Sequence, residues 1–155
     1  MNVVFDANKR LKNDQSPYQT FEQECASCTG LSIMLANACR ASGIPARLAG
    51  IPLWLDNDGN HTWVEVWDDG AWHWVEAYAP APYGQAWWVE KVGGIARDDL
   101  ADPRNRIWAA RWRKGSQDEV FPLPWIEPGD PTIPGEDRTA DYASTPAARS
   151  SDKSE

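Results

Sequence analysis

Residues 27–47 read SCTGLSIMLANACRASGIPAR and are the most informative part of the chain about its structure. Its apolar residues recur at the three- and four-residue spacing of one helix face: Leu31, Met34, Leu35 and Ala38. Ser27 is a suitable N-cap, and Gly43 supplies the left-handed residue that ends a helix. The pattern therefore predicts a helix from Cys28 to about Ser42, with Cys28 in its first turn.

A β-hairpin is predicted for the segments NHTWVEVW (60–67) and WHWVEAY (72–78), where the apolar period is two. The sequence WDDGAW between them is typical of a two-residue turn at Asp69 and Gly70. In that register Trp63 lies opposite Glu76, so His61 and Glu76 share one face of the hairpin. Glu65 lies on the same face, whereas His73 lies on the other.

The remaining segments give a coarser prediction. Residues 46–55 and 107–112 are expected to form strands, and residues 1–22 a short helical segment followed by the polar loop NDQSPYQ. From residue 126 onward the chain is rich in Pro, Asp, Ser and Thr and poor in apolar residues. We therefore expect one domain over residues 1–125 and a mostly disordered acidic tail over 126–155.

Composition excludes several functional classes. The 155 residues are 42% hydrophobic, enough for a core, and the formal net charge of −8 argues against nucleic-acid binding. The sequence contains neither an apolar run of about 20 residues nor a signal-peptide pattern at its start. The chain as written is expected to be cytoplasmic and not membrane-bound, or exported if it is a fragment of a longer protein.

The sequence contains three cysteines that could supply a reactive thiol. Cys28 opens the predicted helix, where unpaired backbone N–H groups and the helix dipole favour a thiolate. Cys25 precedes the helix, and Cys39 falls in its last turns, where a small buried hydrophobic residue is the simpler interpretation. The CxxC spacing of Cys25 and Cys28 is also compatible with a redox pair or half of a zinc site, but no second close pair of ligands follows. We expect no metal and no cofactor.

A histidine that activates a thiol needs a carboxylate to orient it. His61 and Glu76 satisfy this by sharing one hairpin face, with Glu65 as the fallback acid. Ten tryptophans are a large excess for this length. We expect most of them to pack in the core, and we name three as candidates for the walls of a substrate cleft: Trp54, Trp63 and Trp74.

The order of these motifs resembles the transglutaminase-like superfamily, relatives of papain-type cysteine proteases. The matching signature is Cys28, Arg40 twelve residues later, GIPAR at 43–47, HTWVEV at 61–66, and then Trp72 and Glu76. The resemblance implies an α+β papain-like fold, with the nucleophile helix packed on an antiparallel β-sheet. It also implies that Cys28 is the nucleophile, His61 the general base and acid, and Glu76 the third member of the triad.

Two departures from the family pattern are visible. The family usually has Asp-Pro where this chain has Glu76-Ala77, and Cys25 adds a thiol that leaves open a protective disulfide with Cys28. The resemblance places oxyanion stabilisation at the Cys28 N–H and an upstream side chain, for which Gln23 is the candidate.

The predicted function is cysteine-dependent acyl transfer on a peptide or protein amide through a thioester. Hydrolysis is preferred over transglutaminase crosslinking. The alternative is a catalytically inactive module of the same fold that binds peptide or glycan through its aromatic residues. A metal-binding regulator that uses Cys25, Cys28 and a histidine is a third possibility.

Overall fold

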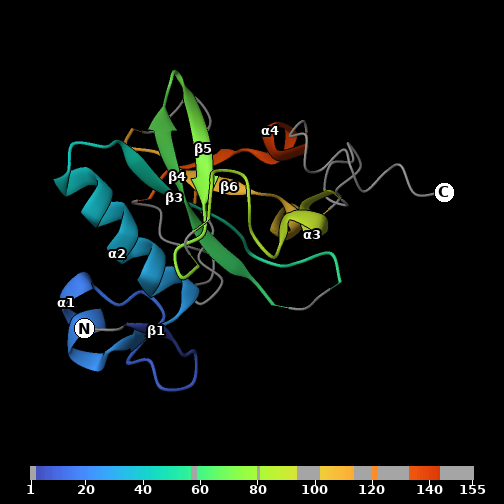
Figure 1. Ribbon diagram of the computed structural model, residues 1–155. Coiled ribbons are helices and arrows are strands. Elements are labelled where there is room, and N and C mark those ends of the chain that lie inside the picture. The colour runs from blue at the N-terminus through green and yellow to red at the C-terminus, as the bar shows by residue number, and fades with distance from the viewer. Residues whose placement is uncertain are drawn as a thin grey trace. The chain divides into compact units, whose positions relative to one another are not determined.

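A computed structural model describes residues 3–56, 59–79, 81–93, 102–113, 120–121 and 133–143 (Figure 1). Contacts divide the chain into two compact units. The first comprises Met1–Leu48 with Thr62–Gln85, and the second comprises Ala49–His61 with Ala86–Glu155. Each unit combines helices with antiparallel strands, so the predicted α+β class is confirmed.

The elements of the first unit are β1 (Val4–Phe5), α1 (Pro17–Gln23), β2 (Cys25–Ala26), α2 (Cys28–Ala41), the first part of β3 (Ala46–Ile51), β4 (His61–Asp68) without its first residue, and β5 (Ala71–Val75). Strands β1 and β2 form a short parallel pair. The larger sheet here has the strand order β5-β4-β3, and β4 and β5 are antiparallel.

Helix α2 begins and ends as its sequence predicts. The Ser27 side chain accepts a hydrogen bond from the Gly30 N–H at 3.3 Å, which caps the first turn. At the other end Gly43 has a φ of 79°, and the Ile44 N–H donates to the Cys39 carbonyl at 2.9 Å. Local capping chemistry thus defines a helix of 14 residues that starts at Cys28.

The core of the first unit lies between α2 and the strands. Its buried members are Ala36, Ala46, Val64 and Val66, and the partly buried side chains of Leu35, Cys39, Leu48 and Val75 pack against them. Every second residue of β4 therefore faces the helix. The predicted packing of the Cys28 helix on antiparallel strands is present in this unit.

The β4–β5 hairpin has the predicted register. Asp68 pairs with Ala71 and Glu65 with Trp74, around a two-residue turn at Asp69 and Gly70. Both turn residues have positive φ values, 46° and 78°, as a type I′ turn requires. The last pair of the ladder is Val64 with Val75. Continuing the count inward places Trp63 opposite Glu76.

The prediction for residues 1–22 is wrong in its order. The helix α1 follows the polar loop instead of preceding it, and Val4 is in a strand paired with Cys25. Ser16 accepts from the Gln19 N–H while the Gln19 side chain accepts from the Ser16 N–H, and Pro17 occupies the first helical position. This capping box starts the helix inside the predicted loop NDQSPYQ.

The second unit contains the last part of β3, then α3 (Val89–Gly93), a 3-10 turn at Pro103–Asn105, β6 (Trp108–Ala110), β7 (Gly135–Asp137) and α4 (Thr139–Ala143). Here β3 pairs with β6, and β6 with β7, both antiparallel. The strand predicted within residues 107–112 is present as β6.

Part of the expected tail has regular structure. Residues 133–143 include β7 and α4, and Tyr142 is buried. The Ile107 N–H donates to the Thr139 side chain at 3.0 Å, so polar contacts and backbone pairing order this stretch without a run of apolar residues. Residues 126–132 and 144–155 lie outside the described ranges, and the domain boundary at residue 125 stays a prediction.

Candidate active site

Cys28 is the first residue of α2, and its side chain is half-buried. The positive end of a helix of this length stabilises a thiolate by its dipole and its unpaired N–H groups. All three cysteines are free thiols. Cys25 is buried in β2, and burial raises the pKa of the Cys39 thiol. Cys28 and Cys39 are both half-buried, and of the three thiols Cys28 alone lies in the first turn of a helix.

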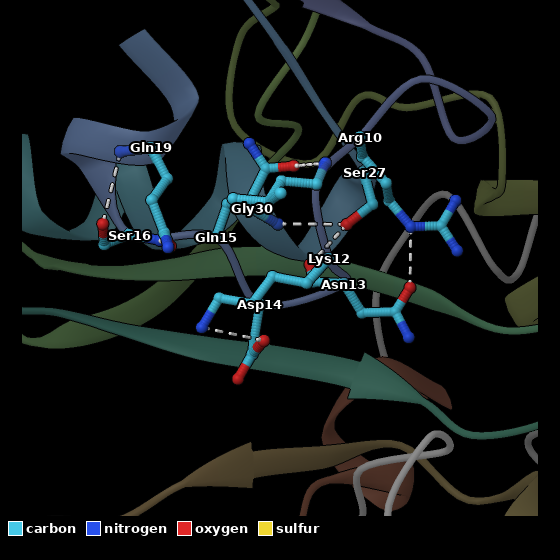
Figure 2. A network of polar contacts seen from close by, with 10 residues as sticks. Arg10, Lys12, Asn13, Asp14, Gln15, Ser16, Gln19, Ser27 and Gly30 are labelled. Atoms are coloured by element: carbon cyan, nitrogen blue, oxygen red, sulfur yellow. Dashed lines mark hydrogen bonds and ion pairs between the residues drawn. The ribbon is translucent and has the colours of Figure 1, made fainter. Parts of the chain in front are cut away.

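A polar network holds the cap residue that directly precedes Cys28 (Figure 2). The Ser27 hydroxyl donates to the Asn13 carbonyl at 2.6 Å while it accepts from the Gly30 N–H. The Asn13 side chain in turn accepts from Arg10 Nε at 2.7 Å. The loop before α1 is thus tied to the first turn of α2, which restricts the backbone at Cys28.

Gln15 is a buried polar residue that sequence reasoning missed. Its side-chain oxygen accepts from the Leu11 N–H at 2.9 Å, and its amide donates to the Cys25 carbonyl at 3.0 Å. It therefore fixes the same loop against β2. Its position in a polar stretch of sequence gives no signal for burial, because the partners lie 4 and 10 residues away.

Gln23, the oxyanion candidate, is the last residue of α1 and is exposed. Glu24 follows it in the left-handed region with a φ of 52°, and its N–H donates to the Phe21 carbonyl. The chain then turns into β2 and reaches Cys28. The role of Gln23 stays a prediction.

Helix α2 is also hydrogen-bonded to the start of β4. Thr29 Oγ1 and Thr62 Oγ1 share a hydrogen bond of 3.0 Å, and the Ser32 hydroxyl donates to the Thr62 carbonyl at 3.0 Å. All three side chains are buried. Thr29 directly follows Cys28, and Thr62 directly follows His61. These two bonds were not predicted, since a threonine in a strand carries no signal for a partner 33 residues away.

His61, the predicted base, lies among indole rings of the second unit. It is 4% exposed. Its ring centroid is 5.1 Å from that of Trp87, 6.3 Å from that of Trp88 and 6.4 Å from that of Trp54, the last in a stacked arrangement. Such rings restrict the orientation of the imidazole. Trp87 and Trp88 were not among the predicted site residues.

The two candidate acids have different surroundings. Glu76 is buried just after β5, and its Oε1 accepts from the Ala77 N–H at 2.8 Å. Glu65 is buried in β4, and its Oε2 accepts from Arg47 Nε at 2.7 Å. Arg47 also lies 4.2 Å above the ring of Trp72. Glu65 thus belongs to a buried ion pair with the arginine of the GIPAR motif.

The three tryptophans predicted to wall a cleft are all buried: Trp54, Trp63 and Trp74. Their low exposure agrees with the expectation that most tryptophans pack in the core. Among the residues that the structure describes, three other tryptophans have large exposed areas: Trp67, Trp87 and Trp112. Of these, Trp87 also contacts the His61 ring.

Neither a metal-binding cluster of side chains nor a membrane-spanning helix is found in the described ranges. Among these residues, no cluster of three or more His, Cys, Asp and Glu side chains is arranged to hold a metal ion. Within the same residues, no helix has the length and apolar character that crossing a bilayer requires.

Comparison with protein families shows which superfamily the chain belongs to. The family model of the transglutaminase-like superfamily matches residues 1–79, about half of the chain, and this range includes Cys28, His61 and Glu76. The chain belongs to the transglutaminase-like superfamily. Members of this superfamily are typically cysteine-dependent acyltransferases and peptidases. A search of curated proteins and a search of solved structures give no significant match. The family match ends before Trp87, Trp88 and α3.

Proposed function

We propose that this transglutaminase-like chain is a cysteine hydrolase that acts on a peptide or protein amide. Cys28 is the nucleophile, His61 the general base and acid, and Glu76 the acid that orients His61. The observation that carries the proposal is the position of Cys28 at the capped start of α2, within the range matched by the family model. The arrangement we propose is papain-like.

Two hydrogen bonds support the pairing of Cys28 with His61. The residues that directly follow the two, Thr29 and Thr62, are hydrogen-bonded through their side chains at 3.0 Å, and Ser32 adds a bond to the Thr62 backbone. These bonds restrain the backbone at the start of α2 against the backbone at the start of β4. A thiol and its base need such restraint, because hydrogen-bond geometry tolerates little displacement.

The proposed reaction has two steps. The Cys28 thiolate attacks the amide carbonyl carbon, the C–N bond breaks, and His61 donates its proton to the leaving amine. Water then attacks the thioester carbonyl while His61 accepts its proton, and the C–S bond breaks to release the carboxylic acid and Cys28. The Cys28 backbone N–H stabilises the oxyanion in both steps, and Gln23 is the candidate for a second donor.

Glu76 is preferred to Glu65 as the orienting acid. The ladder ends at Val64 with Val75, and a count of one further pair would set Trp63 opposite Glu76. By alternation, His61 and Glu76 are then expected to share one face. Glu65, by contrast, is held by Arg47 at 2.7 Å. A carboxylate in a buried ion pair is expensive to separate from its partner, so Glu65 is the poorer candidate.

The test uses two reagents that do not require the natural substrate to be known. Iodoacetamide alkylates thiolates, and p-nitrophenyl acetate acylates an active thiol. Wild type should alkylate faster at Cys28 than at Cys39, and His61→Ala should slow both Cys28 alkylation and p-nitrophenolate release by about 100-fold. His73→Ala is the matched histidine control, and Cys39→Ser is the matched thiol control.

Loss of p-nitrophenolate release in Cys28→Ser, with near wild-type rates in both controls, supports the enzyme. Equal release in Cys28→Ser and wild type contradicts it. If Cys28 alkylates no faster than Cys39 and no variant changes the rate, the chain is better described as the peptide- or glycan-binding module.

A further inference from the structure

The ring cluster around His61 contains a cation that the proposed reaction does not use. We define the acceptor cluster as Trp54, His61, Trp87 and Lys91, together with Asp56. All five residues belong to the second unit. Trp54 and His61 are buried, whereas Trp87 is 53% exposed and forms the outer side of the cluster.

Lys91 places its ammonium on the two indole faces. Its Nζ is 5.5 Å from the ring centroid of Trp54 and 6.0 Å from that of Trp87, within the range of cation–π attraction. The same nitrogen is 2.8 Å from Asp56 Oδ2. The Lys91 side chain is 30% exposed, so the rings and the carboxylate hold it against the protein surface.

The chemistry of this position is that of a primary amine. The Lys91 ammonium lies over the same two rings that contact His61. The His61 ring centroid is 5.1 Å from that of Trp87 and 6.4 Å from that of Trp54. A lysine side chain of a second protein, which is the acceptor in crosslinking, would bring the same group to the same base. The cluster therefore suits an amine acceptor, and the amine it holds is the chain's own.

We propose that the Lys91 ammonium occupies the amine-acceptor position beside His61 and so directs the acyl-enzyme to water. The inference rests on the proposed function, because it takes His61 as the base that activates the acceptor. It adds the reason for hydrolysis: an incoming ammonium must displace Lys91 from two ring faces and from Asp56, whereas water need not.

The two fates of the thioester differ in one bond. With water, a C–O bond forms, the C–S bond breaks, and the products are a carboxylic acid and the Cys28 thiol. With a primary amine, a C–N bond forms, the C–S bond breaks, and a proton from the amine passes through His61 to the Cys28 sulfur. No other reactant is needed, so the occupant of the acceptor cluster determines the partition.

Lys91 lies outside the region that the family model matches. It is in α3, and the match ends at residue 79. Trp87 also lies beyond that limit, while His61 and Trp54 lie within it. A segment outside the family match thus supplies both the outer ring and the cation.

The test measures partition of the acyl-enzyme. Full-length protein is acylated with p-nitrophenyl acetate in the presence of n-butylamine, and the ratio of N-butylacetamide to acetate is determined by mass spectrometry. Lys91→Met, which keeps the length of the side chain without its charge, should raise this ratio about tenfold. Lys91→Arg keeps a cation on the rings and should leave the ratio near wild type. Lys12→Met is the control for loss of a lysine elsewhere.

Methanol as the competing acceptor distinguishes the loss of the Lys91 charge from a change in the space available to the acceptor. Because methanol carries no ammonium, its ester product should rise less than twofold in Lys91→Met. An amide ratio that stays at the wild-type value in Lys91→Met, while acylation still requires Cys28, overturns this inference and leaves the proposed function intact. An equal rise with methanol and n-butylamine also overturns it. Acylation that does not require Cys28 contradicts the proposed function itself.

Discussion

The buried ion pair between Arg47 and Glu65 gives the most quantitative prediction. Their side chains are 5% and 2% exposed, and the Nε to Oε2 distance is 2.7 Å. At an effective dielectric constant of about 20 the attraction at this distance is about 6 kcal/mol, which desolvation of the two charges largely offsets. Removing one partner takes away the 2.7 Å bond that the other buried charge makes to it. Arg47→Met and Glu65→Leu should therefore each lower the free energy of unfolding by about 3–5 kcal/mol.

Urea unfolding of the single and double variants tests this reasoning. The double variant Arg47→Met/Glu65→Leu removes both charges and should recover most of the loss, because an apolar pair of similar volume needs no compensation. Lys12→Met is the matched control: its ion pair with Asp14 has a distance of 3.6 Å and is half exposed, so its loss should cost less than about 1 kcal/mol. A loss below about 1 kcal/mol for Arg47→Met, or a double variant as unstable as the sum of the singles, refutes the argument.

Three further predictions concern α2. Gly30→Ala should destabilise the protein by about 1–3 kcal/mol in urea unfolding, because the added Cβ would lie 2.8 Å from Ala26 Cβ; unchanged stability contradicts this packing. Ser27→Ala removes the cap and should cost about 1 kcal/mol and slow the alkylation of Cys28 by iodoacetamide, whereas an unchanged alkylation rate would separate the cap from thiol reactivity. Burial raises the pKa of Cys39, so in Cys28→Ser its alkylation should increase only above the usual pKa of a thiol; a midpoint below that value contradicts the effect.

Local signals in the sequence predicted the elements that carry the candidate residues. The cap at Ser27 and the left-handed Gly43 bounded α2, and the two-residue turn at Asp69 and Gly70 set the register of the hairpin. Each signal acts within a few residues of the structure it determines. The position of Cys28 at the start of α2 followed from these signals, as did that of Glu76 directly after β5.

Contacts between distant segments could not be predicted in the same way. The ring cluster joins Trp54, His61 and Trp87, and the bond between Thr29 and Thr62 spans 33 residues. Neither has a periodic pattern, and indole rings suit a core as well as a site. The order of strand and helix before α2 was also missed, because the pairing of Val4 with Cys25 is a tertiary contact.

Variants of the two buried glutamates can show which of them orients His61. Glu65 is predicted to matter for stability and Glu76 for activity, so conservative variants of the two should separate. Glu76→Gln should leave the urea midpoint near wild type relative to Glu65→Gln, yet reduce p-nitrophenolate release, because the orienting carboxylate is lost. A variant of Glu65 that loses activity at unchanged stability would reverse the assignment.

A crystal structure of the protein would show whether Cys28, His61 and Glu76 form one catalytic unit. We predict a distance of about 3–4 Å between Cys28 Sγ and one nitrogen of the His61 ring. A Glu76 carboxylate oxygen should lie at hydrogen-bond distance from the other ring nitrogen. A His61 ring that faces away from the Cys28 sulfur, or whose second nitrogen is held by Glu65 instead, contradicts the account.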